Sequence, residues 1–277
     1  MVDTGDGQPT QERQNSGSAR DRVRRVLGAL LVVAAATALV AVVYIGSQLL
    51  GFVTGLVGSA IGLGTIVQFT LLIVVAELLG YGGASAAIVS VARRFDRPLL
   101  RIGVPTVSDL AVIAIGTVVS IGLIYVFNAL SMVLGIDPSS HSIASFGQQT
   151  PLIFLVGAVL SIPVIGLAEE LFFRGVIQDV LGTATPAPVA VVIASVLFSL
   201  PHIFSYLPRD GALTAAALQG TAFSLVMLFV VGLVLGAVYE YSDNLVVPAV
   251  VHGTFNGYQF LLAYVGAVLG LREFGLI

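Results

Sequence analysis

Apolar stretches long enough to cross a lipid bilayer recur along this 277-residue chain. A transmembrane helix needs about 20 mostly apolar residues. Only 10% of the residues are charged, against about 25% in soluble domains. A bilayer offers unpaired backbone groups no hydrogen-bond partner, so the runs predict an all-α, polytopic integral membrane protein with about seven or eight transmembrane helices. Seven expected spans cover residues 26–50, 65–92, 107–130, 151–167, 189–204, 215–239 and 245–269.

Residues 46–64 leave open whether the chain has an eighth span. This segment is apolar but contains six glycines, several at the small-xxx-small spacing that lets membrane helices pack closely. An extracytoplasmic turn, a short re-entrant piece and a separate crossing all fit this pattern.

Clusters of arginine predict the orientation in the membrane. Residues 1–25 are polar and carry five arginines, and four more arginines fall between residues 93 and 101. Cytoplasmic loops are enriched in Lys and Arg, so we expect a multi-pass protein of the cell membrane with a cytoplasmic N-terminus. We divide the chain into a disordered cytoplasmic tail (1–25), N-terminal transmembrane helices (26–150), a catalytic helical core (151–269) and a short C-terminal tail (270–277).

The strongest functional signal is a charged cluster into which the fourth apolar span runs directly. Glu169, Glu170 and Arg174 lie where an ionised side chain costs at least about 2.5 kcal/mol, so charges at this depth indicate a functional site. Glu170 and Arg174 are spaced i and i+4 and can pair along one helix face. Glu169 lies about 100° around the helix, so we expect the two carboxylates to have separate roles.

Two further polar clusters follow in later spans. His202 comes four residues after Phe198, and Asn256 comes four residues after His252. Each cluster alone fits a structural role, because buried polar groups also bond helices together. Together with the Glu pair they suit hydrolysis, with a carboxylate as general base and His252 and Asn256 as donors to one oxyanion.

Metal chemistry is the competing interpretation. Two histidines and one glutamate form a known catalytic zinc set, here Glu169, His202 and His252, although the HExxH signature is absent. The chain has no cysteine, which excludes disulfides and thiolate ligands. No basic stripe indicates nucleic acid.

The three clusters together resemble the CAAX-processing and bacteriocin-immunity (CPBP, or Abi) family of intramembrane endopeptidases. The family's motifs are Glu-Glu-x-x-x-Arg, Phe-x-x-x-His and His-x-x-x-Asn. They occur here in that order as Glu169-Glu170…Arg174, Phe198…His202 and His252…Asn256. Each motif is weak alone, but the ordered set is specific. The resemblance covers residues 151–260.

This resemblance implies a site in a membrane-embedded, water-filled cavity that opens toward the cytoplasm. It implies that Glu169 activates water with His202 beside it and that His252 and Asn256 form an oxyanion hole. Glu170 and Arg174 would support the helix, and Phe198 would pack. We favour a glutamate mechanism without a cofactor and keep zinc as the alternative.

The implied partners are the lipid bilayer and a membrane-anchored protein or peptide, of CAAX type or a peptide precursor. The sequence indicates neither the cleavage site nor an oligomeric state. A non-catalytic scaffold or bacteriocin-immunity protein is the second hypothesis, and a proton- or ion-coupled transporter is the third. We interpret Glu77, in the second span, as a structural hydrogen-bonding residue, and His141 as a solvated loop histidine.

Overall fold

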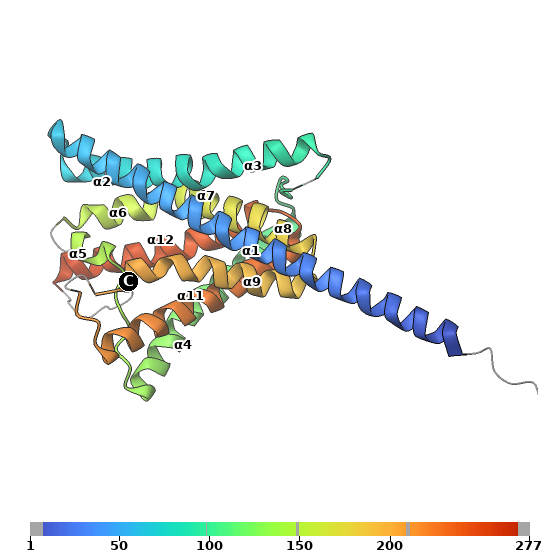
Figure 1. Ribbon diagram of the computed structural model, residues 1–277. Coiled ribbons are helices and arrows are strands. Elements are labelled where there is room, and N and C mark those ends of the chain that lie inside the picture. Colours follow the sequence, from blue (N-terminus) through green and yellow to red (C-terminus); the bar gives the residue numbers. More distant parts are fainter. Residues whose placement is uncertain (1–7, 98, 148–149, 209–210, 271–277) are drawn as a thin grey trace, which may run out of the picture.

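Helices form most of the described protein, and no strand occurs among the described residues (Figure 1). The computed structural model describes residues 8–97, 99–147, 150–208 and 211–270. The N-terminal part is a long helical hairpin followed by a third long helix and a short one. Its elements are α1 (Gln8–Ala60), α2 (Thr65–Val74), η1 (Val75–Gly82), α3 (Gly83–Arg94), α4 (Val107–Leu134) and α5 (Ile143–Gly147).

The C-terminal part contains the three motifs. One continuous helix carries the Glu pair, and η2 and η3 are π-helical turns within it. Pro163 lies in η2, where its missing N–H removes one backbone hydrogen bond. The elements are α6 (Leu152–Leu160), η2 (Ser161–Gly166), α7 (Leu167–Phe172), η3 (Phe173–Gln178), α8 (Asp179–Gly182), α9 (Ala187–Ser199), η4 (Leu200–His202), α10 (Ile203–Tyr206), α11 (Ala215–Ser242) and α12 (Val246–Leu269).

Six helices in the described ranges are long and apolar enough to span a membrane. The prediction of an all-α polytopic membrane protein is therefore confirmed, but the expected number of such helices was seven or eight. The seventh expected span forms α12, which is 24 residues long and is not among the six. It carries His252, Asn256 and Gln259, and the protein around it accepts this polarity because α12 packs against η2, α4 and α6.

The first span is longer than its apolar pattern suggested. The glycine-rich segment 46–64 is not a separate crossing, because α1 continues to Ala60 and a turn with Gly62 at φ 72° leads into α2. At its other end α1 begins at Gln8, within the segment for which we predicted disorder; residues 1–7 lie outside the described residues. Gln, Glu and Arg are good helix formers, and extending an existing helix costs little compared with starting one.

Two buried clusters hold the motif helices in place. The larger one joins α1, η1 and α3 to the Glu-bearing helix and α9, through residues such as Val40, Tyr81 and Phe173. The other joins α4, α11 and α12, through residues such as Ile124 and Val251. The motif-bearing helices are thus packed from both sides, which fixes their mutual positions.

Candidate active site

A buried ion pair anchors the site. Glu170 Oε2 accepts a hydrogen bond from Arg174 Nε at 2.9 Å, and both side chains are 0% exposed. The guanidinium also donates from Nη1 to Gln178 Oε1 at 3.3 Å. Its central carbon lies 5.6 Å from the centre of the Phe198 ring, within cation–π range. The i, i+4 pairing predicted from the sequence is therefore present.

The second carboxylate oxygen of Glu170 orients His252. The distance from Glu170 Oε1 to His252 Nδ1 is 2.9 Å. A carboxylate accepts hydrogen bonds, so the ring carries a proton on Nδ1 and, when neutral, a lone pair on Nε2. Asn256 Nδ2 lies 3.2 Å from that Nε2 and donates to it. Glu170, His252 and Asn256 thus form one chain across the interface between α7 and α12.

Two glycines allow the Glu-bearing helix and α12 to approach each other closely. At Gly253, next to His252, an added Cβ would lie 2.4 Å from Ile162 Cα in η2. At Gly166, three residues before Glu169, it would lie 2.6 Å from the Ala249 carbonyl oxygen. Real Cβ atoms do not come this near to backbone. The two glycines therefore allow the backbones to approach closely, as small residues do between membrane helices.

Glu169 occupies a different environment from its neighbour. Its side chain is 9% exposed and lines a cavity, whereas Glu170 is 0% exposed and is not among the lining residues. Within the described part of the chain Glu169 Oε2 has no hydrogen-bond partner. The two adjacent carboxylates are thus separated into one that is locked in an ion pair and one that faces the cavity.

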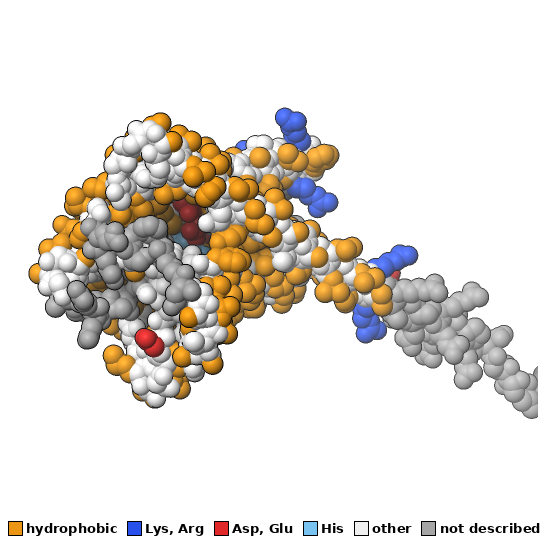
Figure 2. Space-filling model, turned by 60° about the vertical axis from the view of Figure 1, so that its left-hand side comes forward, with side chains coloured by type: hydrophobic (Ala, Val, Ile, Leu, Met, Phe, Trp, Pro, Cys, Tyr) orange, Lys and Arg blue, Asp and Glu red, His pale blue; other side chains and the backbone are white. Residues whose placement is uncertain are grey.

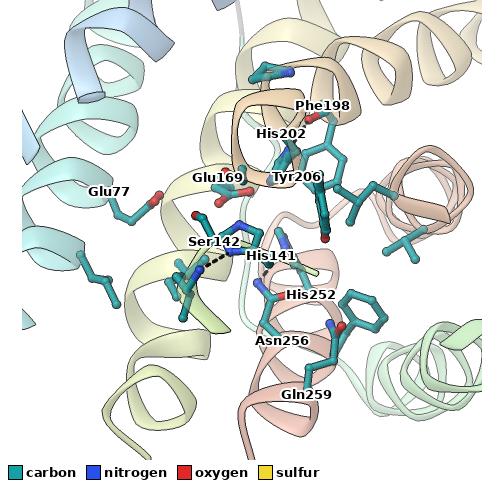
Figure 3. A pocket seen from close by; sticks show the side chains of 18 of the residues that line it. Glu77, His141, Ser142, Glu169, Phe198, His202, Tyr206, His252, Asn256 and Gln259 are labelled. Atoms are coloured by element: carbon teal, nitrogen blue, oxygen red, sulfur yellow. Dashed lines mark hydrogen bonds between the residues drawn. The ribbon is translucent and has the colours of Figure 1, made fainter. Parts of the chain in front are cut away.

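The cavity has a volume of about 320 Å³ and gathers the predicted catalytic residues (Figure 3). A volume of this size is at the lower end for ligand pockets. Glu169, His202, His252 and Asn256 all line it, as does Phe198, while Arg174 lies behind it. The other lining residues are Tyr44, Gln48, Ile73, Glu77, Tyr81, His141, Ser142, Ile143, Ile165, Pro201, Ser205, Tyr206, Leu228, Val231, Phe255, Gln259 and Phe260.

His202 is held by its own helix end. Its Nδ1 lies 2.9 Å from the Phe198 carbonyl oxygen. A carbonyl only accepts, so Nδ1 carries the proton and Nε2 is the acceptor of the neutral ring. The ring centre is also 5.2 Å from that of Phe198. Phe198 therefore packs against three motif residues, Arg174, His202 and His252, and its backbone carbonyl positions His202.

Two residues in the cavity were interpreted differently from the sequence. His141 was predicted to be a solvated loop histidine; it does lie in the connection before α5, but it is half-buried rather than fully solvated. It lines the cavity, its Nδ1 accepts from the Ile143 backbone N–H at 3.2 Å, and its ring packs edge-on against Tyr206. His141 lies far from the three motifs in the sequence, so no pattern indicated that it would line the same cavity.

Glu77 was interpreted as a structural hydrogen-bonding residue. Its side chain points from η1 toward Glu169 (Figure 3), and its Oε2 has no partner within the described residues. The available signal was its ionisable side chain inside an apolar span, which is a functional indication by default.

The alternative zinc ligands do not form a metal-ligand cluster. Glu169, His202 and His252 all face the cavity, yet no group of three or more His, Cys, Asp or Glu residues in the described ranges is arranged to hold a metal ion. His202 and His252 each keep Nε2 as the available ring nitrogen, so each is chemically able to serve as a ligand.

The cavity opens at the end of the molecule that carries α5. Figure 2 turns this end toward the viewer and shows acidic side chains at the bottom of a hollow, with arginine side chains at the far end. The resemblance implied a cytoplasmic opening, and the arginines implied a cytoplasmic location for their own end. The structure places the cavity opening and the arginines at opposite ends of the molecule, so the opening and the arginines cannot both be on the cytoplasmic side.

Comparison with known proteins identifies the motif-bearing region. Residues 149–258 match the family model described as type II CAAX prenyl endopeptidase Rce1-like. Comparisons with curated proteins and with solved structures give no match. The match spans the region in which the sequence predicted the CAAX-protease resemblance, and it contains all three motifs. This match confirms the resemblance to CAAX endopeptidases that the motifs predicted, over residues 149–258.

Proposed function

We propose that the protein is an intramembrane endopeptidase in which Glu169 activates a water molecule for attack on a peptide bond. The supporting observation is the separation of the two carboxylates: Glu170 is neutralised by Arg174 behind the cavity, while Glu169 lines the cavity and its Oε2 has no hydrogen-bond partner among the described residues. Pairs of acids in different environments commonly divide catalytic roles.

In this mechanism Glu169 removes a proton from water as the oxygen of that water bonds to the carbonyl carbon of the substrate. The carbonyl becomes a tetrahedral oxyanion. Glu169 then returns the proton to the leaving nitrogen as the carbon–nitrogen bond breaks. General base catalysis of this kind contributes about 10²- to 10⁴-fold. Nε2 of His202 is the available acceptor for a hydrogen bond from the same water.

His252 and Asn256 are proposed to bind the oxyanion. Their facing nitrogens are 3.2 Å apart, so one oxygen atom can lie within hydrogen-bond distance, about 2.9 Å, of each. His252 donates from Nε2 only when Nδ1 and Nε2 are both protonated. The buried Glu170 carboxylate at Nδ1 stabilises such a cation. Glu170 is thus a positioning residue that acts through His252.

The proposed mechanism uses no metal, and zinc held by Glu169, His202 and His252 is the alternative. When bound, zinc would polarise the carbonyl and lower the pKa of its water. A non-catalytic scaffold or immunity protein would need the Glu170–Arg174 pair for folding but not Glu169.

The substitution Glu169→Gln tests the proposal, with Glu170→Gln as a comparison. Purified variants are assayed on a panel of fluorogenic membrane-anchored peptides, and their thermal unfolding is measured in the same detergent. We expect Glu169→Gln to abolish cleavage without a change in melting temperature. Full activity of a folded Glu169→Gln variant on a verified substrate would refute the role of this residue.

A further inference from the structure

The position of the cavity along the helices shows toward which end of the molecule it extends from Glu169. On α12, the cavity-lining residues begin at His252 and continue to Phe260. The start of α12 lies at the arginine-bearing end, because the Leu245 backbone N–H donates to the Arg101 carbonyl oxygen at 2.7 Å. The cavity therefore extends from His252 away from the arginines.

The other motif helices agree. On the helix of the Glu pair, Ile165 and Glu169 line the cavity, and no later residue does. Beyond Glu169 this helix runs toward the arginine end, where Asp179 pairs with Arg101. On the helix of the second motif, the lining residues run from Phe198 to the end of α10, away from the arginines.

Tightly packed side chains close the cavity floor on the arginine side. Phe172, Phe173, Arg174 and Gln178 follow Glu169 along the helix, and each is at most 1% exposed. Gln178 Nε2 further donates to Glu240 Oε1 at 2.7 Å, which joins this layer to α11. Opening a path through it would break a buried ion pair, and removing one partner of such a pair costs about 3–5 kcal/mol.

On the opposite side the cavity adjoins a vestibule that is lined by both polar and apolar residues. A second cavity of about 500 Å³ shares His141, Ser142, Ser205 and Tyr206 with the first. Its other lining residues include Ser139 and Ser140 in the connection between α4 and α5. A peptide backbone entering the membrane needs hydrogen-bond partners throughout, and serine, tyrosine and histidine are side chains that can both donate and accept hydrogen bonds.

The distribution of arginine assigns the two ends to the two sides of the membrane. Of the twelve arginines, nine precede α4 in the segments 13–25 and 93–101, and those whose side chains are described lie at the closed end (Figure 2). Two, at positions 209 and 272, fall outside the described residues. By the positive-inside rule the closed end is cytoplasmic.

We propose that the cavity opens on the extracytoplasmic side, so that the substrate is a peptide segment presented from that side, such as the extracytoplasmic juxtamembrane stretch of a membrane-anchored protein. The orientation stands on the geometry and the charges alone, and the substrate class rests on the proposed function. A lipid-modified C-terminal tail in the cytoplasm would face the closed floor beneath Glu169.

The absence of cysteine from the sequence makes the orientation directly measurable. Ser140→Cys places a thiol at the vestibule, and Val104→Cys places one in the exposed connection before α4, where the native side chain is 90% exposed. Each single-cysteine protein is treated with a membrane-impermeant maleimide in intact cells and again after permeabilisation, with the cysteine-free parent as the background.

We expect Ser140→Cys to be labelled equally before and after permeabilisation and Val104→Cys only afterwards. The reverse pattern, or equal labelling of both in intact cells, would overturn the proposal. Neither measurement depends on catalysis.

Two reporter proteins then test the substrate class. Each carries the same cleavable peptide beside one membrane helix, on the extracytoplasmic side in one reporter and on the cytoplasmic side in the other. We expect cleavage of the first alone, lost with Glu169→Gln. Cleavage of the cytoplasmic reporter alone would refute the assigned substrate class. If neither is cleaved, the proposed function fails, and the labelling still decides which side the cavity faces.

Discussion

Replacing Arg174 with methionine is expected to destabilise the protein strongly, because it leaves a carboxylate buried without its ion-pair partner. Methionine keeps much of the length of the arginine side chain but removes its charge. Glu170 would retain His252 Nδ1 at 2.9 Å and lose Arg174 Nε at 2.9 Å. The contacts of the guanidinium with Gln178 and Phe198 would also be lost.

The size of the effect follows from burial, since both partners are 0% exposed. Removing one partner of a fully buried pair costs about 3–5 kcal/mol. Unfolding entropy near 2.1 cal/mol/K per residue, taken over the whole chain, converts this to a fall in melting temperature of about 5–9 °C. A protonated His252 would partly compensate the unpaired charge of Glu170, so we expect a fall at the lower end of this range.

Thermal unfolding of the purified protein in detergent measures the effect, and a double-mutant cycle identifies its cause. Glu170→Gln and Arg174→Met are each compared with the double variant, in which neither charge is present. The double variant should be more stable than the sum of the two single losses predicts. Arg94→Met, at an exposed position, is the control for lost arginine. A fall of less than about 2 °C for Arg174→Met would refute the reasoning.

Two further substitutions test how the helices are held. Gly253→Ala should lower the free energy of unfolding by about 1–3 kcal/mol, because its Cβ would lie 2.4 Å from Ile162 Cα. Gly257→Ala is the control and should be neutral or stabilising, because its Cβ would be 3.5 Å from its nearest neighbour. Equal melting temperatures of the two variants would contradict the close approach of η2 and α12. Arg101→Lys should lose about 1–3 kcal/mol, because the guanidinium bonds three carboxylates at 2.8–3.1 Å in a geometry that an ammonium does not reproduce. Arg94→Lys is its control, and an equally small change in both would show that the network contributes nothing measurable.

Much of the site could be predicted because its residues follow helical spacing. The i, i+4 positions of Glu170 and Arg174 place them on one helix face wherever the helix is buried, and the structure pairs them at 2.9 Å. The spacing of His252 and Asn256 likewise predicted neighbours one turn apart, and they lie 3.2 Å from each other. These are local properties of a helix, and they do not depend on the rest of the fold.

The remainder depended on tertiary packing, which spacing does not encode. The contact between Glu170 and His252 spans 82 residues and relies on Gly166 and Gly253 to bring two backbones together. His141 reaches the cavity from the connection between α4 and α5, where its ring packs against Tyr206, and no periodic pattern marks such a loop. The helix through residues 46–60 continues despite its glycines because Gly51, Gly55 and Gly58 each face side chains of the neighbouring hairpin arm.

The end at which the cavity opens was also beyond sequence reasoning. Charge patterns orient the helices in the bilayer, but they do not show which half of each helix lines a cavity. Only the packing decides which half it is. Phe172 and Phe173 are buried on one side of Glu169, and the cavity lined by His141 and Tyr206 lies on the other.

The role of Glu169 is tested most directly by peptide cleavage with the wild-type protein and Glu169→Gln, each with and without a strong chelator. We predict that the wild type cleaves in the presence of chelator and that Glu169→Gln loses about 10²-fold or more of this activity while keeping the wild-type melting temperature. Undiminished cleavage by Glu169→Gln would contradict the role of Glu169 as the base. Loss of wild-type cleavage on chelation, restored by zinc, would instead place His202, His252 and a glutamate around a metal ion.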